Sequence, residues 1–114
     1  LSQHQSIREN IAKSYAELEM ARLLVHKTCW HIDHHGVKPS IELISATKIS
    51  VPLMIQAIID RCMQMHGAGG LTEDWCMAEQ FNYARWCRQA DGPDEVHQMA
   101  LGKRIIQQHA EASK

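Results

Sequence analysis

Apolar residues recur along this chain at alternating spacings of three and four, which is the repeat of one face of an α-helix. In residues 3–35 they fall at Ile7, Ile11, Leu18, Val25 and Ile32. Gly36 follows directly, and glycine readily takes the left-handed conformation that ends many helices. The pattern therefore predicts a first helix over residues 3–35.

A second apolar repeat covers residues 39–66, at Ile41, Ile44, Val51, Ile55, Ile58, Ile59 and Cys62. Pro39 suits the first position of a helix, where its missing N–H is not needed. Pro52 lies inside the repeat, so we expect either a kinked helix that loses one hydrogen bond or a helix broken at Ser50. The kink is favoured because the apolar register continues beyond the proline.

Two shorter helices are expected in the remainder of the chain. Gly67–Gly70 ends the second helix, and Thr72 is a suitable N-cap for a third helix that runs to about Ala90. A fourth helix follows Asp91-Gly92-Pro93 and fades into the polar C-terminus. No stretch alternates with a period of two, so the sequence predicts an all-α fold, an antiparallel four-helix bundle with short loops.

Several of these helices are apolar on more than one side. Leu23 and Leu24 point in different directions on a helix, as do Met54 and Ile55. A helix that is apolar around much of its circumference requires a neighbour on each side. We therefore expect a partner domain or subunit to cover part of this chain.

Length and charge narrow the possible classes of protein. With 114 residues the chain forms at most one domain, 1–114, and because it begins without a methionine we expect a piece of a longer subunit. The net charge of -1 gives no broad attraction to nucleic acid or to an anionic membrane. No apolar run is expected to reach the length of a membrane span.

The cysteines and histidines are interpreted as structural. The cysteines Cys29, Cys62, Cys76 and Cys87 are widely spaced and form no CxxC pair, which favours free thiols in a reducing, intracellular compartment. Cys29, His31, His34 and His35 resemble metal ligands, but a solvated helix end is the preferred interpretation, and no metal site is predicted. Single histidines at positions 26, 97 and 109 are interpreted in the same way.

Two interhelical corners are candidates for chemistry. The glycine run after Met65-His66 is not a Walker loop, because no Lys-Ser or Lys-Thr follows it, yet its bare backbone would let a cofactor approach closely. At the second corner, Asp91 could simply cap the fourth helix, with Pro93 as its first residue. Alternatively, Asp91 is a working acid.

Taken in order, several short motifs resemble the C-terminal helical domain of the acyl-CoA dehydrogenase flavoproteins. The resemblance covers about residues 3–106 and rests on His4-Gln5, Lys48, Gln64-Met65-His66-Gly67-Ala68-Gly69-Gly70, Ala84-Arg85 and Asp91-Gly92. The stretch ADGPDEVH is similar to acyl-CoA dehydrogenase family members 10 and 11 and their bacterial relatives. The resemblance implies a bundle that lacks the first helix of this domain.

The resemblance also implies an activity, the introduction of an α,β double bond into an acyl-CoA. Asp91 would be the catalytic base that removes the α-proton, while the β-hydrogen leaves as hydride to FAD. Gly92 would lie against the thioester of the substrate. Most of the family has glutamate where this chain has Asp91, and the shorter side chain reduces the reach of the base by about 1.5 Å.

Cofactor and partners follow from the same resemblance. The residues expected to contact FAD are His4, Gln5, Gln64, Met65, His66, Gly67, Ala68, Pro93, Asp94 and Glu95. Gln64 to Ala68 would reach the FAD of a neighbouring subunit in a homodimer or homotetramer, and an electron-transfer flavoprotein would accept the electrons. The remaining domains would lie outside these residues, so the chain alone is expected to be inactive. A non-catalytic helical module for oligomerisation or flavin contact is the alternative.

Overall fold

The computed structural model describes residues 1–113 and is entirely helical in that range. Its α-helices are α1 (Gln5–His35), α2 (Ile41–His66), α3 (Met77–Cys87) and α4 (Asp94–Ala112). Two short 3-10 helices, η1 (Lys38–Ser40) and η2 (Gly67–Leu71), come directly before and after α2 in the sequence. The prediction of an all-α fold with four antiparallel helices is confirmed.

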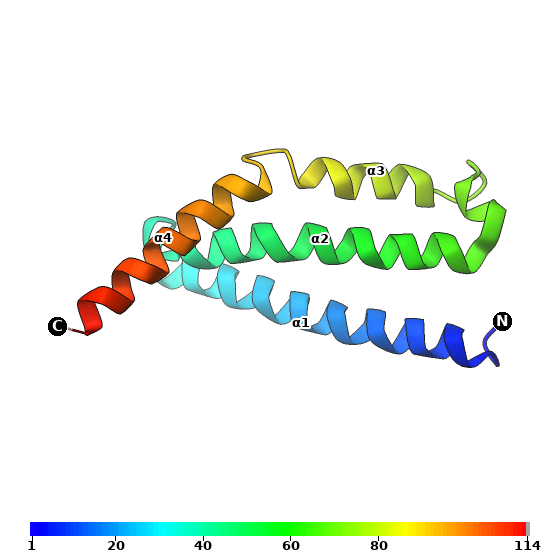
Figure 1. Cartoon of the computed structure of the whole chain (residues 1–114), viewed down its shortest axis with the longest axis horizontal. Coiled ribbons are helices and arrows are strands. Elements are labelled where there is room, and N and C mark those ends of the chain that lie inside the picture. The colour runs from blue at the N-terminus through cyan, green and yellow to red at the C-terminus, as the bar shows by residue number, and fades with distance from the viewer. Residues whose placement is uncertain (114) are drawn as a thin grey trace.

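Helix α2 is the centre of the arrangement. Helices α1 and α3 lie along opposite sides of α2, and α4 crosses α2 obliquely (Figure 1). Within residues 1–113, α1, α3 and α4 each pack on α2 and do not pack on one another. The molecule is therefore elongated, 56 × 28 × 26 Å, with a radius of gyration of 17.5 Å, against about 13 Å for a compact domain of this length.

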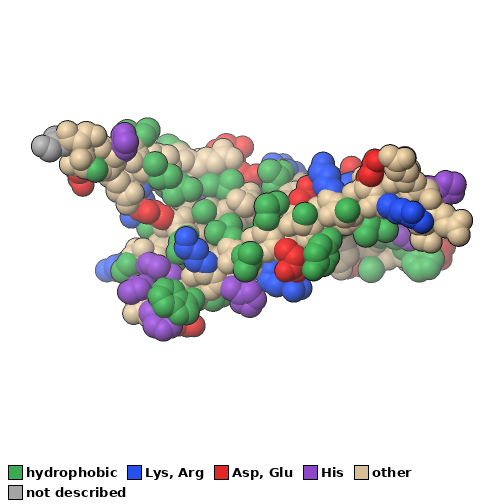
Figure 2. Space-filling view, turned by 90° about the horizontal axis from the view of Figure 1, so that it is seen from below, with side chains coloured by type: hydrophobic (Ala, Val, Ile, Leu, Met, Phe, Trp, Pro, Cys, Tyr) green, Lys and Arg blue, Asp and Glu red, His purple; other side chains and the backbone are tan. Residues whose placement is uncertain are grey.

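The interior is correspondingly sparse. Among the described residues, Ala84 and Gly70 are the buried positions without a polar side chain, and the other buried positions are polar: Thr28, Ser40, Ser45 and Asp94. The accessible surface is 8371 Å², whereas a folded monomer of this mass exposes about 6,300 Å². Hydrophobic side chains reach the surface along the whole of the face in Figure 2. The expectation of apolar faces in need of a partner is confirmed.

Polar contacts supplement the limited apolar contact between α1 and α2. Arg61 on α2 donates from Nε to Ser14 Oγ at 3.1 Å and pairs with Glu17 through Nη2. The hydroxyls of Thr28 and Thr47 are 2.8 Å apart, and Thr28 also donates to the carbonyl of Leu24. These contacts fix the register of the two long helices.

The long helices end where the sequence predicts. Gly36 follows α1 with φ 82°, and its N–H donates to Ile32 O at 2.8 Å. Helix α2 runs without a break through Pro52, so the alternative of a break at Ser50 is wrong. Pro39 lies in η1, just before α2, and not in the first turn of α2 itself.

The shorter helices differ from the prediction at their ends. Helix α3 begins at Met77, because the Thr72 hydroxyl donates to Gly69 O at 2.8 Å and closes a turn in place of an N-cap. It ends at Cys87, three residues earlier than expected. Pro93, in an extended conformation, precedes the first residue of α4, so Asp91 does not cap that helix.

By length and composition alone, the helical run Lys38–Leu71 is apolar enough to cross a membrane, with a mean hydropathy of 1.4. The expectation that no run reaches this length is therefore wrong by this criterion. The same run contains α2, which is flanked by three other helices. A central helix of this kind carries apolar residues on several sides, so the criterion is weak support for a span.

Candidate functional site

The turn between α3 and α4 gives Asp91 an unusual backbone. Asp91 has φ 55° and is the one described residue other than glycine with a positive φ; Gly92 follows with φ 99°. Aspartate is among the residues that tolerate this left-handed region. The amides of Gln89 and Ala90 donate to Trp86 O, at 2.8 and 3.0 Å, whereas those of Asp91 and Gly92 donate to no backbone carbonyl in residues 1–113. The turn therefore leaves the Asp91 N–H without a backbone partner.

A shallow hollow of about 440 Å³ adjoins this turn, and we call it the Asp91 hollow. It is lined by Thr47, Lys48, Val51, Pro52, Tyr83, Trp86, Cys87, Ala90 and Asp91. The rings of Tyr83 and Trp86 are stacked with centroids 5.4 Å apart. Lys48 Nζ donates to the carbonyl of Cys87 and so ties α2 to the end of α3. Asp91 itself is exposed in this chain.

Gly92 is half-buried against a histidine of α4. A Cβ atom at this position would lie 3.1 Å from His97 Nε2, and the φ of 99° would strain any side chain. The chain therefore requires glycine here for its own packing, whatever substrate is bound. The contact with a thioester, which the resemblance implies, stays a prediction.

Hydrogen bonds of Arg88 join the two ends of the turn to each other and to α2. Arg88 Nε donates to Asp94 Oδ2 at 2.7 Å, and Arg88 Nη1 donates to Gln56 Oε1 at 2.9 Å. The Asp94 amide donates to Arg88 O at 3.2 Å, so these two residues are joined twice across the turn. Asp94 is buried, and its Oδ1 atom has no partner among the described residues. Pro93 and Glu95, in contrast, are exposed.

His97 connects the turn to the central helix. Its Nε2 atom lies 3.2 Å from Asp91 O, and its Nδ1 atom lies 3.3 Å from Ser45 Oγ. The interpretation of His97 as a solvated histidine is therefore wrong, because it is half-buried and engaged at both nitrogens. The sequence gives no direct signal for this contact, since Ser45 lies on α2, far away along the chain.

The glycine corner presents mostly uncharged groups. Gln64, His66, Gly67 and Ala68 are exposed, and Met65 is half-buried. Gly67 has φ 58° and ends α2, whereas Gly70 is buried so tightly that a Cβ atom would lie 2.5 Å from Met63 O. His66 Nδ1 is 2.8 Å from Cys62 O, which leaves Nε2 at the surface. Amide, imidazole and backbone groups thus face outward together.

The predicted cofactor residues fall into separate places. His4 and Gln5 are exposed at the start of α1, at the same end of the molecule as η2, although α1 and η2 do not touch (Figure 1). The Asp91 turn lies at the other end of α3, and a helix of eleven residues spans about 16 Å. The structure therefore brings Asp91, Gly92, Pro93, Asp94 and Glu95 together and holds Gln64 to Ala68 apart from them.

Histidines gather where α1 ends (Figure 2). The His34 ring stacks on Trp30, with centroids 4.3 Å apart, and its Nδ1 atom lies 2.7 Å from Trp30 O. His31 Nδ1 is 2.8 Å from Ser40 Oγ. In the described part of the chain, no three histidine, cysteine or acidic side chains are placed to hold a metal ion. All four cysteines are free thiols.

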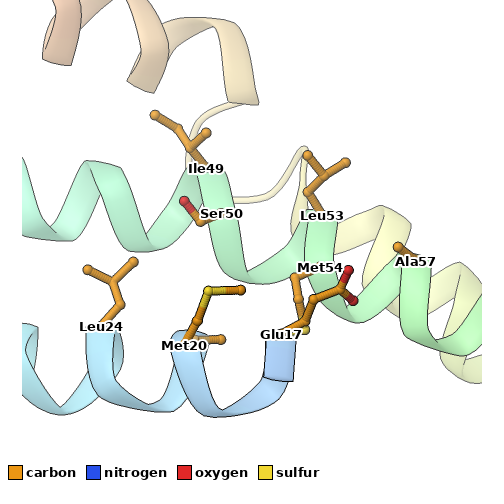
Figure 3. Close-up of a pocket in the computed structure, with 9 residues that line it drawn as sticks. Glu17, Met20, Leu24, Ile49, Ser50, Leu53, Met54 and Ala57 are labelled. Atoms are coloured by element: carbon orange, nitrogen blue, oxygen red, sulfur yellow. The ribbon is translucent and has the colours of Figure 1, made fainter. Parts of the chain in front are cut away.

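A larger hollow lies away from Asp91. It measures about 560 Å³ and is lined by residues of α1 and α2; Met20 and Leu24 extend from α1 toward α2 (Figure 3). Glu17 and Ser50 supply its few polar atoms. None of the residues predicted for catalysis or cofactor binding lines this α1–α2 groove, which has the character of a packing surface.

Comparison with known proteins gives consistent matches. The sequence model described as "Acyl-CoA dehydrogenase, C-terminal domain" matches residues 1–106. The chain is 44% identical to mouse acyl-CoA dehydrogenase family member 10 over 103 residues, which are 90% of this chain and 10% of that protein. Against rat family member 11 it is 36% identical over 114 residues, all of this chain and 15% of that protein.

A solved structure from Mycobacterium abscessus, assigned as an acyl-CoA dehydrogenase, superposes with a TM-score of 0.87. It is 36% identical, and the match covers 90% of this chain and 25% of that one. The chain thus spans a quarter or less of the proteins it matches. The resemblance drawn from the motifs is confirmed.

Proposed function

We propose that this chain, which belongs to the acyl-CoA dehydrogenase family, forms part of a flavin-dependent enzyme that introduces an α,β double bond into an acyl-CoA thioester. The observation that carries the proposal is the conformation of Asp91. Asp91 has a left-handed backbone and is among the residues that line an apolar, aromatic hollow, and its amide has no backbone partner within residues 1–113.

Asp91 would act through two of its groups. Its carboxylate would accept the α-proton of the substrate, which is general base catalysis by a positioned side chain. Its free N–H would donate to the thioester carbonyl and stabilise the negative charge that develops there as the proton leaves. The Asp91 hollow offers apolar and aromatic contacts to an acyl chain. Proton removal and carbonyl polarisation would thus come from a single residue.

The residues at the two corners fit FAD in their chemistry. Exposed amide, imidazole and backbone groups of Gln64, His66 and Gly67 are neutral donors and acceptors, suited to the polar parts of the cofactor. When bound, FAD supplies the acceptor for the β-hydrogen as hydride. Pro93 and Glu95 are exposed beside Asp91 and would line the same site, whereas the Asp94 side chain is occupied by Arg88.

An assembly of subunits would bring the Gln64 loop of one copy and the Asp91 turn of another to the same flavin. Because the Gln64 loop and Asp91 lie at opposite ends of α3, we propose that the loop of one copy serves the flavin site of a neighbouring copy. The surface excess of about 2,000 Å² over a compact monomer is larger than the roughly 800 Å² that each partner contributes to a standard protein interface, so it is sufficient for an extensive contact. The α1–α2 groove would be part of the covered surface in a homodimer or homotetramer.

The test of this proposal is Asp91→Asn in the intact protein, with FAD content checked by flavin absorbance. After anaerobic mixing with a panel of acyl-CoAs, we expect wild type to bleach the flavin and the variant to lose at least about 10³-fold in rate, because it lacks the base. Asp33→Asn, an exposed carboxylate at the end of α1, is the matched control and should behave as wild type. Normal flavin bleaching in Asp91→Asn would refute the assignment.

The same measurement separates the alternative function. A non-catalytic module for oligomerisation or flavin contact is favoured by the large exposed apolar surface. It predicts that wild type holds FAD and assembles but never bleaches with any acyl-CoA. For the catalytic enzyme, we further propose that an electron-transfer flavoprotein reoxidises the flavin. We also propose that the protein works in a reducing compartment, a proposal supported by its four free thiols.

A further inference from the structure

Two sets of side chains hold the turn that carries Asp91, and each set contacts a different part of it. Arg88 and Asp94 join the beginning of the turn to the first residue of α4. They fix how the two helices meet, but neither touches Asp91. The side-chain contact to the Asp91 peptide itself comes from His97, whose Nε2 atom lies 3.2 Å from Asp91 O.

We propose that His97 is a positioning residue for the dehydrogenation, because its hydrogen bond to Asp91 O holds the Asp91 backbone in the left-handed conformation. This inference rests on the proposed role of Asp91 as the base. His97 would not touch the substrate. Its effect would pass through the Asp91–Gly92 peptide plane, because fixing this plane restrains the backbone torsions of Asp91 and so the directions of its carboxylate and its own N–H.

The hydrogen bonds assign the tautomer of a neutral His97 ring. A carbonyl oxygen only accepts, so His97 Nε2 must carry the hydrogen and donate to Asp91 O. Nδ1 is then the acceptor in the neutral ring, and the Ser45 hydroxyl, 3.3 Å away, donates to it. Ser45 is 5% exposed and belongs to the rigid central helix. The chain of contacts therefore ties the Asp91 peptide to α2.

Gly92 supplies independent support. A Cβ atom at this position would come within 3.1 Å of His97 Nε2, so glycine provides the space that the imidazole occupies. Asp91, Gly92 and His97 thus act as one unit, in which the small residue admits the ring and the ring holds the strained residue. Without the ring, the Asp91 peptide would be free to rotate toward the more common conformations of L-residues.

The size of the effect follows from geometry. A displacement of about 1 Å at a reacting group can reduce a rate about 100-fold. Removing the hydrogen bond should therefore lower the rate of flavin reduction by about 10- to 100-fold. The dissociation constant for acyl-CoA should change by less than about threefold, because His97 makes no contact with the substrate and the loss is confined to the chemical step.

The experiment uses the intact, FAD-loaded protein and compares His97→Leu with His97→Gln. Glutamine can place an N–H near the position of Nε2, so we expect it to keep the rate within about fivefold of wild type, whereas leucine loses 10- to 100-fold. His109→Leu, the same change at an exposed position of α4, is the matched control for a general effect on the helix. Equal rates for leucine, glutamine and wild type would overturn the proposal, as would equal losses in leucine and glutamine.

Two further variants keep the result interpretable. If His97→Leu does not incorporate FAD, Ser45→Ala takes its place. This change frees the imidazole from α2, so a loss of at least threefold supports the proposal and a wild-type rate overturns it. Asp91→Asn separates the two levels of inference. If Asp91→Asn abolishes flavin reduction while His97→Leu does not affect it, only the role of His97 fails; if Asp91→Asn is active, the proposed function itself fails.

Discussion

Replacing Arg88 by methionine tests whether the Arg88–Asp94 pair determines the stability of the turn that carries Asp91. The Asp94 side chain is 11% exposed and that of Arg88 is 27% exposed. One carboxylate oxygen of Asp94 already has no partner. Arg88→Met would leave a buried charge without compensation, a change that costs about 3–5 kcal/mol in full burial and about 2–3 kcal/mol at the partial burial seen here.

The opposite change, Asp94→Asn, should be milder. It removes the buried charge, and the more exposed Arg88 keeps its bond to Gln56 Oε1. A cost of about 1 kcal/mol is expected, which is the net value of a typical hydrogen bond. The two variants therefore break the same ion pair but should differ in stability by about 1–2 kcal/mol.

Amide hydrogen exchange in the intact protein measures this difference locally. In peptides that cover residues 86–100, Arg88→Met should accelerate exchange by about 30- to 140-fold, because each 1.4 kcal/mol is a factor of ten. Arg22→Met is the control, since its pair with Glu19 is exposed, at 57% and 38%, and should change exchange in its own peptide by less than about fivefold. If Asp94→Asn proves as damaging as Arg88→Met, the uncompensated charge is not the source of the effect.

Further substitutions test the packing of the helices. Gly70→Ala should destabilise the protein by about 1–3 kcal/mol, because its Cβ would overlap the backbone of α2. Gly102 has open space around it in α4, so Gly102→Ala should stabilise the protein by about 0.5–1 kcal/mol. Melting temperatures that do not move in opposite directions would contradict this. Thr28→Val should cost about 1–2 kcal/mol by removing a partner of the Thr47 hydroxyl, and the double replacement of both threonines by valine should cost less than the single one in the same melting assay. Leu53→Glu, at the edge of the α1–α2 groove, should shift the intact protein toward smaller oligomers in analytical ultracentrifugation, and an unchanged sedimentation profile would exclude this surface from the interface.

The long helices were predictable because their signals are local. A three-and-four apolar repeat followed by glycine determined α1 and α2 to within two residues at each end. The start of α3 was misplaced because Thr72 looks like a cap, whereas its hydroxyl closes the turn onto Gly69. Gly70 packs against the backbone of Met63 in the same region. Contacts between elements decide that boundary, and a single sequence does not display them.

Within the candidate site, the sequence could indicate only the residue type of the proposed base. Asp91 is marked by the motif that surrounds it, but its left-handed backbone depends on the folded turn. The sequence does place opposite charges on either side of the turn, at Arg88 and Asp94, and this pattern could have predicted the ion pair that closes the turn. The role of His97 could not be separated from those of the other single histidines, because its partner Ser45 lies on a different helix.

The central position of α2 has a consequence for the order in which the domain forms. The pairs α1 with α2 and α2 with α3 join neighbours in the sequence, and such local contacts form early in folding. Docking of α4 on α2 closes the longest loop of the chain. Ser45 and His97 meet only in that step, so the Asp91 turn acquires its contact with α2 last, after the rest of the scaffold is in place. A protease that cuts near the start of α4 would therefore disrupt this turn while leaving α1 and α3 in contact with α2.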